Sequence, residues 1–283
     1  MLPWLSSHTY SIGPLVLQTW GTFVAAGFLL GGWIAAKRAV KKGLDPKIVW
    51  DLVFWIFVAA FIGARAFHVF AYEPGYYLLH PLDAIDPRKP GYAIMGGFLG
   101  AWLAFWIIIR KRGLDLLSYA DTLVWGLPWG CGVGRIGCFL IHDHPGTLTS
   151  FALGVRYPDG QTRHDLGLYL SILGFAIGLA FVVMDRKKRA AGFYFGSFLI
   201  IYGIARFLLD FLRIIDTRYF GLTPTQWLLL AFVAMGAVIL SRHRAEEGSL
   251  MTRDLYYYPS SWQPTNLFHP RTFEIPRITQ DAV

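Results

Sequence analysis

The pattern of hydrophobic and polar positions is dominated by long apolar runs with short charged segments between them. A helix needs about 20 apolar residues to cross roughly 30 Å of hydrocarbon. Windows of about this length can be drawn at seven places, about 15–36, 48–70, 92–109, 117–141, 166–184, 194–213 and 224–241. The pattern therefore predicts an all-α, polytopic membrane protein with seven transmembrane helices.

The distribution of Lys and Arg between the predicted spans indicates their orientation. The first, third, fifth and last connections hold fourteen of these residues, and the other three hold six. Because cytoplasmic loops are enriched in Lys and Arg, we expect a periplasmic N-terminus and a cytoplasmic C-terminus. The long outer connections, about 71–91 and 142–165, carry acids, prolines and histidines, and we expect them to be ordered external loops.

Composition agrees with a membrane protein and narrows the possible partners. Hydrophobic residues make up 55% of the chain and charged residues 16%, and the mean hydropathy is +0.44. The net charge of +8 comes from basic residues between the apolar runs, which form no surface stripe. We therefore expect membrane lipids as partners and no nucleic acid.

Two further features concern the ends of the chain and its cysteines. The first apolar run is long and its positive charges follow it, so we expect it to remain a span and not a cleaved signal peptide. Residues 1–244 then form the membrane domain, and 245–283 a polar cytoplasmic tail that is disordered or lies on the inner membrane surface. Cys131 and Cys138, seven residues apart on one helical face, are expected to be buried thiols without a disulfide.

Three arginines fall inside predicted spans. Arg65, Arg135 and Arg206 each lie six or seven residues before the outer end of a span, which is roughly 10 Å deep at 1.5 Å per residue. An arginine near the centre of a membrane helix costs about 2.5 kcal/mol or more, so three at one depth favour a common anionic partner such as a phosphate. The alternative is that each arginine reaches the headgroups or pairs with a structural acid such as Asp210.

Possible acid/base chemistry lies next to this arginine layer. His142, Asp143 and His144 follow the fourth span, and His164 precedes the fifth, so these four are candidate catalytic residues. The histidines with nearby acids could instead bind a metal, although no diagnostic spacing is present and we predict none. A purely structural loop, with side chains that cap helix ends, is a further alternative.

Several short motifs resemble the bacterial prolipoprotein diacylglyceryl transferases over about residues 11–241. The most specific is GVGRIGCFLIHDHPG, and SIGPLVLQTWG, GARAFHVF, AIMGGFLG, YGIARFLLDFLR and TPTQW support it. The resemblance implies a multi-pass enzyme of the bacterial inner membrane that moves the diacylglyceryl group of phosphatidylglycerol to the lipobox cysteine of a preprolipoprotein and releases glycerol phosphate. No cofactor is expected. Arg135 and Arg206 match arginines that bind the lipid phosphate, and Arg65 is a possible third.

The chain departs from the family pattern at several positions around this site. Cys138 replaces the signature asparagine, Met95 a histidine often proposed as the base, and Asp143 a glutamate. Since methionine cannot take a proton, we expect the base among His142, His144 and His164. The expected pocket lining comprises Met95, Gly96, Gly97, Cys138, Gly146, Tyr169 and Asp210. The alternative function is a non-enzymatic transporter or receptor for an anionic solute or lipid, although no internal repeat is visible.

Overall fold

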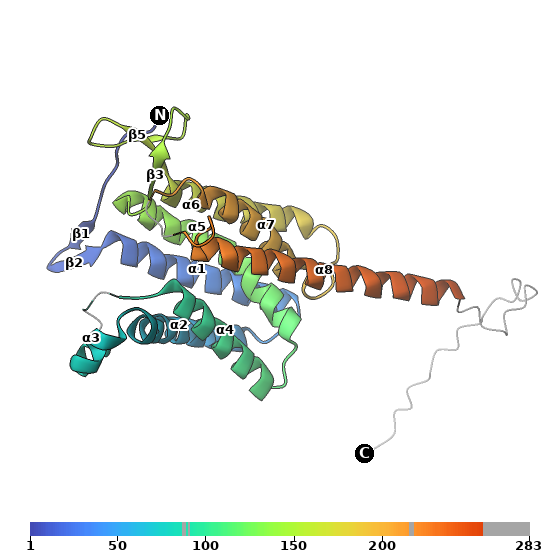
Figure 1. Ribbon diagram of the computed structural model, residues 1–283. Coiled ribbons are helices and arrows are strands. Elements are labelled where there is room, and N and C mark those ends of the chain that lie inside the picture. Colours follow the sequence, from blue (N-terminus) through green and yellow to red (C-terminus); the bar gives the residue numbers. More distant parts are fainter. Residues whose placement is uncertain (87–88, 90, 215–217, 257–283) are drawn as a thin grey trace, which may run out of the picture. The chain divides into compact units, whose positions relative to one another are not determined.

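The computed structural model describes residues 1–86, 89, 91–214 and 218–256, except for the side chains of residue 94 and of residues 243–256. Its long helices (Figure 1) are α1 (Thr19–Lys41), α2 (Pro46–Phe67), α4 (Ile94–Lys111), α5 (Leu116–Ile141), α6 (Leu166–Met184), α7 (Phe193–Asp210) and α8 (Pro224–Tyr256). A π-helical turn, η1 (His68–Tyr72), a short helix, α3 (Pro74–Leu79), and a 3₁₀ turn, η2 (Pro81–Ala84), follow α2.

Within the described residues, six helices are long and apolar enough to cross a membrane. They are Thr19–Lys41, Pro46–Tyr72, Leu116–Ile141, Leu166–Met184, Phe193–Asp210 and Pro224–Arg242. These six correspond to six of the seven predicted spans and make the chain a multi-pass membrane protein. The remaining predicted span, 92–109, coincides with the 18-residue helix α4, whose membrane crossing stays a prediction.

Short strands were not predicted, so the expected all-α fold needs a correction. Strands β1 (Thr9–Ile12) and β2 (Leu15–Gln18) form a hairpin before α1, so α1 begins four residues after the start of the first predicted span. Between α5 and α6 lies an antiparallel sheet of order β3-β5-β4, formed by β3 (Pro145–Leu148), β4 (Val155–Arg156) and β5 (Thr162–Asp165). Each strand is too short for alternation to be visible in the sequence.

The helices pack at glycines, as membrane helices often do. Helix α1 packs closely along α5 and helix α2 along α4. A Cβ placed on Gly126 of α5 would lie 2.0 Å from the carbonyl oxygen of Gly31 in α1. Only a residue without a Cβ allows the two backbones to come this close, so the small residues set the distance between these helices.

The two ends of the helical unit differ in chemistry. At one end, the cationic connections form ion pairs, with Arg38 on Asp185 at 2.6 Å and Arg112 on Asp51 at 2.8 Å. The other end, here called the sheet end, carries β3-β5-β4, and the N-terminal segment joins it through a hydrogen bond from the Leu2 amide to Gly154 O at 2.8 Å. The basic connections and the 142–165 segment therefore lie at opposite ends of α5.

Parts of the chain lie outside these observations. Helix α8 continues past the expected boundary at residue 244 and ends at Tyr256. The rest of the expected tail, 257–283, and residues 87, 88 and 90 of the expected outer loop lie outside the described residues.

Candidate active site

Two of the three predicted arginines come together at the sheet end of the helices. Arg135 projects from the last two turns of α5, and Arg206 from the last two turns of α7. The two guanidinium charges interact with each other, and Tyr202 of α7 lies close enough to interact with both. Arg206 is only 6% exposed and Arg135 is half-buried. Two like charges held together out of water favour an anionic partner.

Arg206 is held by a polar network that joins α7 to the start of α8. Its Nη1 atom lies 2.9 Å from Asp210 Oδ1, but this ion pair lacks hydrogen-bond geometry, and within the described chain both buried atoms are without a hydrogen bond. Asp210 is fully buried and accepts a short hydrogen bond from the Thr223 hydroxyl. Gln226 donates to the Phe207 carbonyl at 3.1 Å. The network fixes Arg206 and leaves its Nη1 with an unused donor.

The third predicted arginine, Arg65, has different neighbours. Its guanidinium donates to backbone carbonyl oxygens of η2 and of the segment that follows it, including Asp83 at 2.6 Å, Ala84 at 3.0 Å and Gly91 at 2.9 Å. Its carbon Cζ also lies 5.4 Å from the centre of the Tyr77 ring. We therefore correct the expected phosphate role, because these carbonyls engage the donors of Arg65 and make it a clamp for the loop.

His142 occupies a structural position. It ends α5 in the left-handed conformation, with φ of 50°, and its ring is buried. The Nδ1 atom lies 2.6 Å from Asp165 Oδ2, and Nε2 lies 3.1 Å from the Leu5 carbonyl oxygen. Trp4 stacks on the ring with centroids 3.8 Å apart. Both ring nitrogens are directed at groups of the protein, so neither faces a substrate, which argues against the expected catalytic role.

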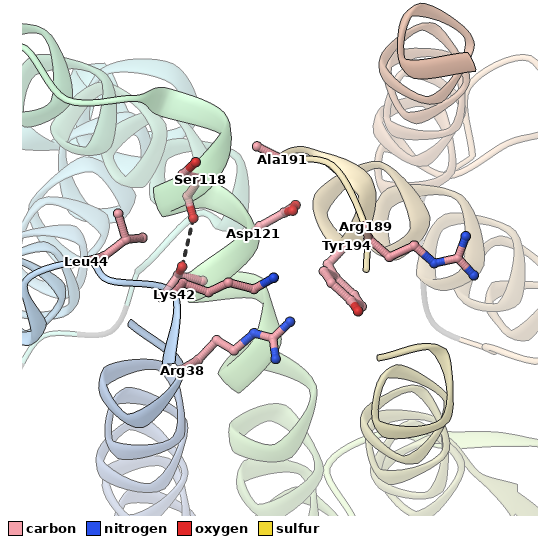
Figure 2. A pocket seen from close by; sticks show the side chains of 9 residues that line it. Arg38, Lys42, Leu44, Ser118, Asp121, Arg189, Ala191 and Tyr194 are labelled. Atoms are coloured by element: carbon pink, nitrogen blue, oxygen red, sulfur yellow. Dashed lines mark hydrogen bonds between the residues drawn. The ribbon is translucent and has the colours of Figure 1, made fainter. Parts of the chain in front are cut away.

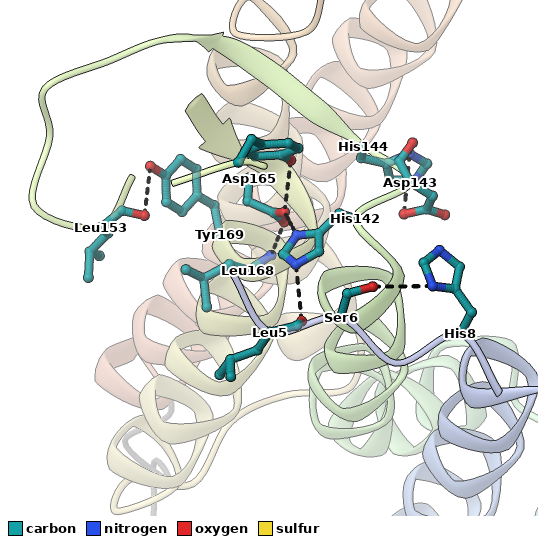
Figure 3. A network of polar contacts seen from close by, with 11 residues as sticks. Leu5, Ser6, His8, His142, Asp143, His144, Leu153, Asp165, Leu168 and Tyr169 are labelled. Atoms are coloured by element: carbon teal, nitrogen blue, oxygen red, sulfur yellow. Dashed lines mark hydrogen bonds and ion pairs between the residues drawn. The ribbon is translucent and has the colours of Figure 1, made fainter. Parts of the chain in front are cut away.

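Cys138, Asp143 and His144 form a compact group beside Arg135. One ligand-type atom from each of the three lies within 4.8 Å of the others. Arg135 Nη1 donates to Cys138 Sγ at 3.7 Å, and His144 Nδ1 lies 2.9 Å from the Asp143 carbonyl oxygen. Figure 3 shows His142 directed toward Leu5 and Asp165, away from Asp143 and His144. The left-handed turn at His142 therefore separates residues that are adjacent in the sequence.

The local environment of His144 favours its neutral form. Partial burial lowers the pKa of His144, the charges of Arg135 and Arg213 lower it further, and Asp143 opposes them. A carbonyl oxygen can only accept a hydrogen bond, so Nδ1 carries the proton toward Asp143 O and Nε2 keeps the lone pair. Of the predicted histidines, His144 is the one whose ring nitrogen is both oriented and close to the arginine pair.

His164, Tyr169 and Gly146 belong to the packing of the sheet. His164 Nδ1 lies 2.7 Å from the Tyr169 hydroxyl, and the ring packs near Phe151. Burial alone lowers the pKa of His164, with no charged group of the described chain contributing. A Cβ on Gly146 would lie 2.9 Å from the Leu212 carbonyl oxygen, so this glycine lets β3 pass close to the end of α7. These residues support the site and do not bring a base to the arginines.

Gly96 and Gly97, both expected to line the pocket, have different surroundings. A Cβ on Gly96 would lie 2.2 Å from the Gly63 carbonyl oxygen, so Gly96 serves the contact between α4 and α2. Gly97 has ordinary space around it, with Ala60 O at 3.5 Å from such a Cβ. Met95 is half-buried in the first turn of α4. Helix packing thus explains Gly96, and the pocket role of Gly97 and Met95 stays a prediction.

A cavity of about 200 Å³ lies at the other end of α5. Figure 2 shows Arg38 and Lys42, from the end of α1, and Tyr194 of α7 facing it. Asp121 borders it and accepts hydrogen bonds from the amides of Gly192 and Phe195 at the start of α7. The cavity is distinct from the arginine pair, since Arg135 lies thirteen residues after Thr122, which is roughly 20 Å along the helix.

Comparison with known proteins decides the family. Residues 8–242 match the family model described as prolipoprotein diacylglyceryl transferase. The chain belongs to this family. It is 33% identical over 248 residues to the phosphatidylglycerol–prolipoprotein diacylglyceryl transferase of Cupriavidus metallidurans. The match covers 81% of this chain and 90% of that protein. A protein of the same name from Nitratidesulfovibrio vulgaris is 31% identical over 248 residues, which are 84% of this chain and 94% of that protein. Another from Tolumonas auensis is 32% identical over 240 residues, which are 81% of this chain and 92% of that protein.

As a member of the prolipoprotein diacylglyceryl transferase family, the chain is a transferase, and the expected resemblance is confirmed. The sequence reasoning overlooked some residues that shape the site, namely Tyr202, Thr223, Gln226 and Arg213. The motif TPTQW carried the signal for two of them, because a Thr three residues before a Gln is typical of a helix start. Its contact with α7 follows from the tertiary structure alone.

Proposed function

We propose that this protein transfers the diacylglyceryl group of phosphatidylglycerol to the lipobox cysteine thiol of preprolipoproteins and releases glycerol phosphate. The observation that carries the proposal is the pair of interacting guanidinium groups, Arg135 and Arg206, beside a cysteine, a carboxylate and an imidazole at one end of the helices. The family match and the names of the relatives support the same reaction.

The arginine pair suits the phosphate of the lipid. A guanidinium group matches phosphate oxygens with two parallel donors, and the bond is stronger where water is scarce. Arg206 Nη1 is buried and pairs with Asp210 but makes no hydrogen bond within the described residues, so it can still donate to a phosphate oxygen. When the bond between the glycerol carbon and the phosphate oxygen breaks, negative charge grows on the leaving phosphate. Arg135 and Arg206 stabilise this charge in the transition state.

The attacking group is the thiol of the substrate. A free cysteine has a pKa near 8.5, so only a few per cent is thiolate at neutral pH, and the thiolate is the nucleophile. We assign its activation to the group of Cys138, Asp143 and His144, which adjoins Arg135. His142 and His164 are left out, because the ring of His142 is held between acceptors and that of His164 packs against Tyr169.

The reaction fits the outer face of the bacterial inner membrane. The ion pairs of Arg38 and Arg112 lie at the end of the helices that the positive-inside rule assigns to the cytoplasm. The arginine pair lies at the opposite, sheet end, which we assign to the periplasm together with the N-terminus. A lipid and a membrane-anchored preprolipoprotein would both reach a site at this depth from the bilayer.

The test is a transfer assay with purified protein. Incubation with phosphatidylglycerol and a lipobox peptide should add the mass of one diacylglyceryl group to the peptide and release glycerol phosphate. A lipobox peptide with Ser in place of Cys is the control and should stay unmodified. An unmodified Cys peptide, together with binding or uptake of an anionic solute by the same preparation, would contradict the proposal and favour the transporter alternative.

A further inference from the structure

The group formed by Cys138, Asp143 and His144 combines three different types of metal ligand. A thiol, a carboxylate and an imidazole each place one ligand-type atom within 4.8 Å of the other two. We propose that this group binds a divalent transition ion of the zinc class, and that the ion takes the substrate thiolate as its fourth ligand. The inference rests on the proposed function, since it explains how the acceptor thiol is activated. It replaces the sequence-based expectation of no metal.

The spacing of the three ligands is close to that of a bound ion. Zinc binds sulfur at about 2.3 Å and nitrogen or oxygen at about 2.0–2.2 Å, so ligands at the corners of a tetrahedron are about 3.5 Å apart. The present separations, up to 4.8 Å, need to shrink by about 1 Å. Cys138 is fixed near the end of α5, whereas Asp143 and His144 lie in the loop before β3 and keep about 30% of their side chains exposed. Small side-chain rotations of the two loop residues would close the site.

The surroundings already orient the ligands. A histidine that binds a metal through one nitrogen usually donates its other N–H to a carbonyl or carboxylate, which fixes the ring. His144 Nδ1 lies 2.9 Å from the Asp143 carbonyl oxygen, so Nε2 remains for a metal. Arg135 Nη1 donates to Cys138 Sγ at 3.7 Å, which holds the sulfur in place beside the two loop residues. The indole of Trp20 also interacts with this sulfur.

The donor set selects among ions and leaves room for a substrate. Thiolate and imidazole favour zinc and related transition metals, whereas magnesium and calcium prefer oxygen ligands. Three protein ligands with an open fourth position are typical of catalytic zinc sites, and four are typical of structural ones. The second cysteine, Cys131, lies two turns earlier in α5, outside the group. The geometry therefore points to a catalytic arrangement.

The charges balance through the reaction. A doubly positive ion offsets the Cys138 thiolate and the Asp143 carboxylate, and the incoming substrate thiolate adds one negative charge beside Arg135. As the sulfur binds the ion, its proton passes to water. A lone pair of the substrate sulfur then attacks the glycerol carbon and forms the carbon–sulfur bond. The bond between this carbon and the phosphate oxygen breaks, its electrons stay on the phosphate oxygen, and that oxygen later takes a proton from water. The thioether product is neutral and binds the ion weakly, so it leaves.

Binding of Co²⁺ tests the site without reference to transfer. Purified full-length protein, stripped with a chelator, should bind one Co²⁺ per chain with the charge-transfer absorption of a cobalt–thiolate bond, and excess Zn²⁺ should remove this band. Cys138→Ser should abolish the band, and Asp143→Asn and His144→Gln should weaken Co²⁺ binding by about 10-fold or more. Cys131→Ser is the matched control and should keep the band. Asp143 lies in a loop and is partly exposed, so Asp143→Asn should fold normally. Its effect on Co²⁺ binding therefore tests the site even if Cys138→Ser fails to fold.

The outcomes separate the metal from the reaction. Absence of a Co²⁺–thiolate band, or a band that survives Cys138→Ser, would overturn the metal site. Full peptide transfer by a preparation shown to be free of metal would also overturn it and leave His144 as a direct base, while the proposed function stands. A band lost with Cys138→Ser and transfer restored by Zn²⁺ would support both. The same band without any peptide transfer, with or without metal, would support the site and contradict the proposed function.

Discussion

Two adjacent glycines in α4 should respond in opposite ways to the same substitution. Gly96 and Gly97 share a helix, a depth and a neighbouring helix, α2, yet their surroundings differ. A Cβ on Gly96 would lie 2.2 Å from the Gly63 carbonyl oxygen and 2.3 Å from Phe67 Cβ. A Cβ on Gly97 would lie 3.5 Å from the Ala60 oxygen and 3.7 Å from Ala64 Cβ. The same methyl group therefore enters a filled space at one position and an ordinary contact at the next.

The expected effects have opposite signs. Ordinary contacts begin near 3.4 Å, so the Gly96→Ala methyl is more than 1 Å too close to two atoms that belong to, or are fixed by, the α2 backbone. Overpacking of this kind costs about 1–3 kcal/mol. At about 2–4 °C per kcal/mol, the melting temperature should fall by about 4–8 °C for the middle of that range. Gly97→Ala meets no such obstacle, and the better helix propensity of alanine should stabilise the folded protein by up to about 1 kcal/mol.

The measurement compares thermal unfolding of wild type, Gly96→Ala and Gly97→Ala in one detergent, by loss of helical circular dichroism and by aggregation. The expected order of melting temperature is Gly97→Ala at or above wild type, and Gly96→Ala clearly below both. Equal melting temperatures for the two variants would refute the close approach of α2 and α4. A larger loss for Gly97→Ala would mean that α4 is rotated relative to the described packing.

The other predictions concern the site and its supports. Arg135→Lys keeps the charge but loses the planar fork, so peptide transfer should fall at least about 100-fold at unchanged melting temperature. Arg65→Lys should instead make the 81–91 loop more sensitive to protease, and equal sensitivity would count against the clamp. His144→Gln should lose transfer and His164→Gln should retain it; the reverse result would place the base in β5. Arg38 lowers the pKa of Asp185, so this group stabilises the fold above its unfolded pKa of about 3.9 and loses that effect as pH falls below it. The melting-temperature difference between wild type and Asp185→Asn should therefore stay constant well above pH 4 and shrink as the pH falls from about 4 toward the lowered pKa of Asp185, and a difference that does not shrink in acid would contradict the ion pair.

The sequence predicted how deep a residue lies in the membrane better than it predicted which side of its helix the residue faces. The fifth predicted span, 166–184, matches α6 in full, because Asp165 caps its first turn and polar residues follow its end. Equal depth also correctly suggested that Arg135 and Arg206 are neighbours. The same argument failed for Arg65, because its partners are carbonyl groups of a loop, and backbone carbonyls leave no mark in a sequence.

The site residues illustrate the same limit at shorter range. His142 and His144 look equivalent in the sequence, yet one left-handed residue directs them to different sides of the end of α5. Two partners of His142, Trp4 and the Leu5 carbonyl, come from the N-terminal segment, whose backbone pairs with β4 far along the chain. No periodicity in either segment indicates this contact. Alternation and spacing describe single elements, whereas the site is made where the ends of α5 and α7 meet the loop before β3.

The structural role of His142 has a consequence for how the reactive group is held. Its ring joins Asp165, which caps α6, to the N-terminal segment, and Ser7 N donates to the Leu140 carbonyl at 2.9 Å beside it. The end of α5 is therefore fixed on one side by buried hydrogen bonds, and the loop with Asp143 and His144 emerges on the other. A reactive group needs a fixed anchor and some freedom to close on a ligand. Here Cys138 and the His142 network provide the fixed anchor, and the partly exposed loop residues Asp143 and His144 can move to close on a ligand.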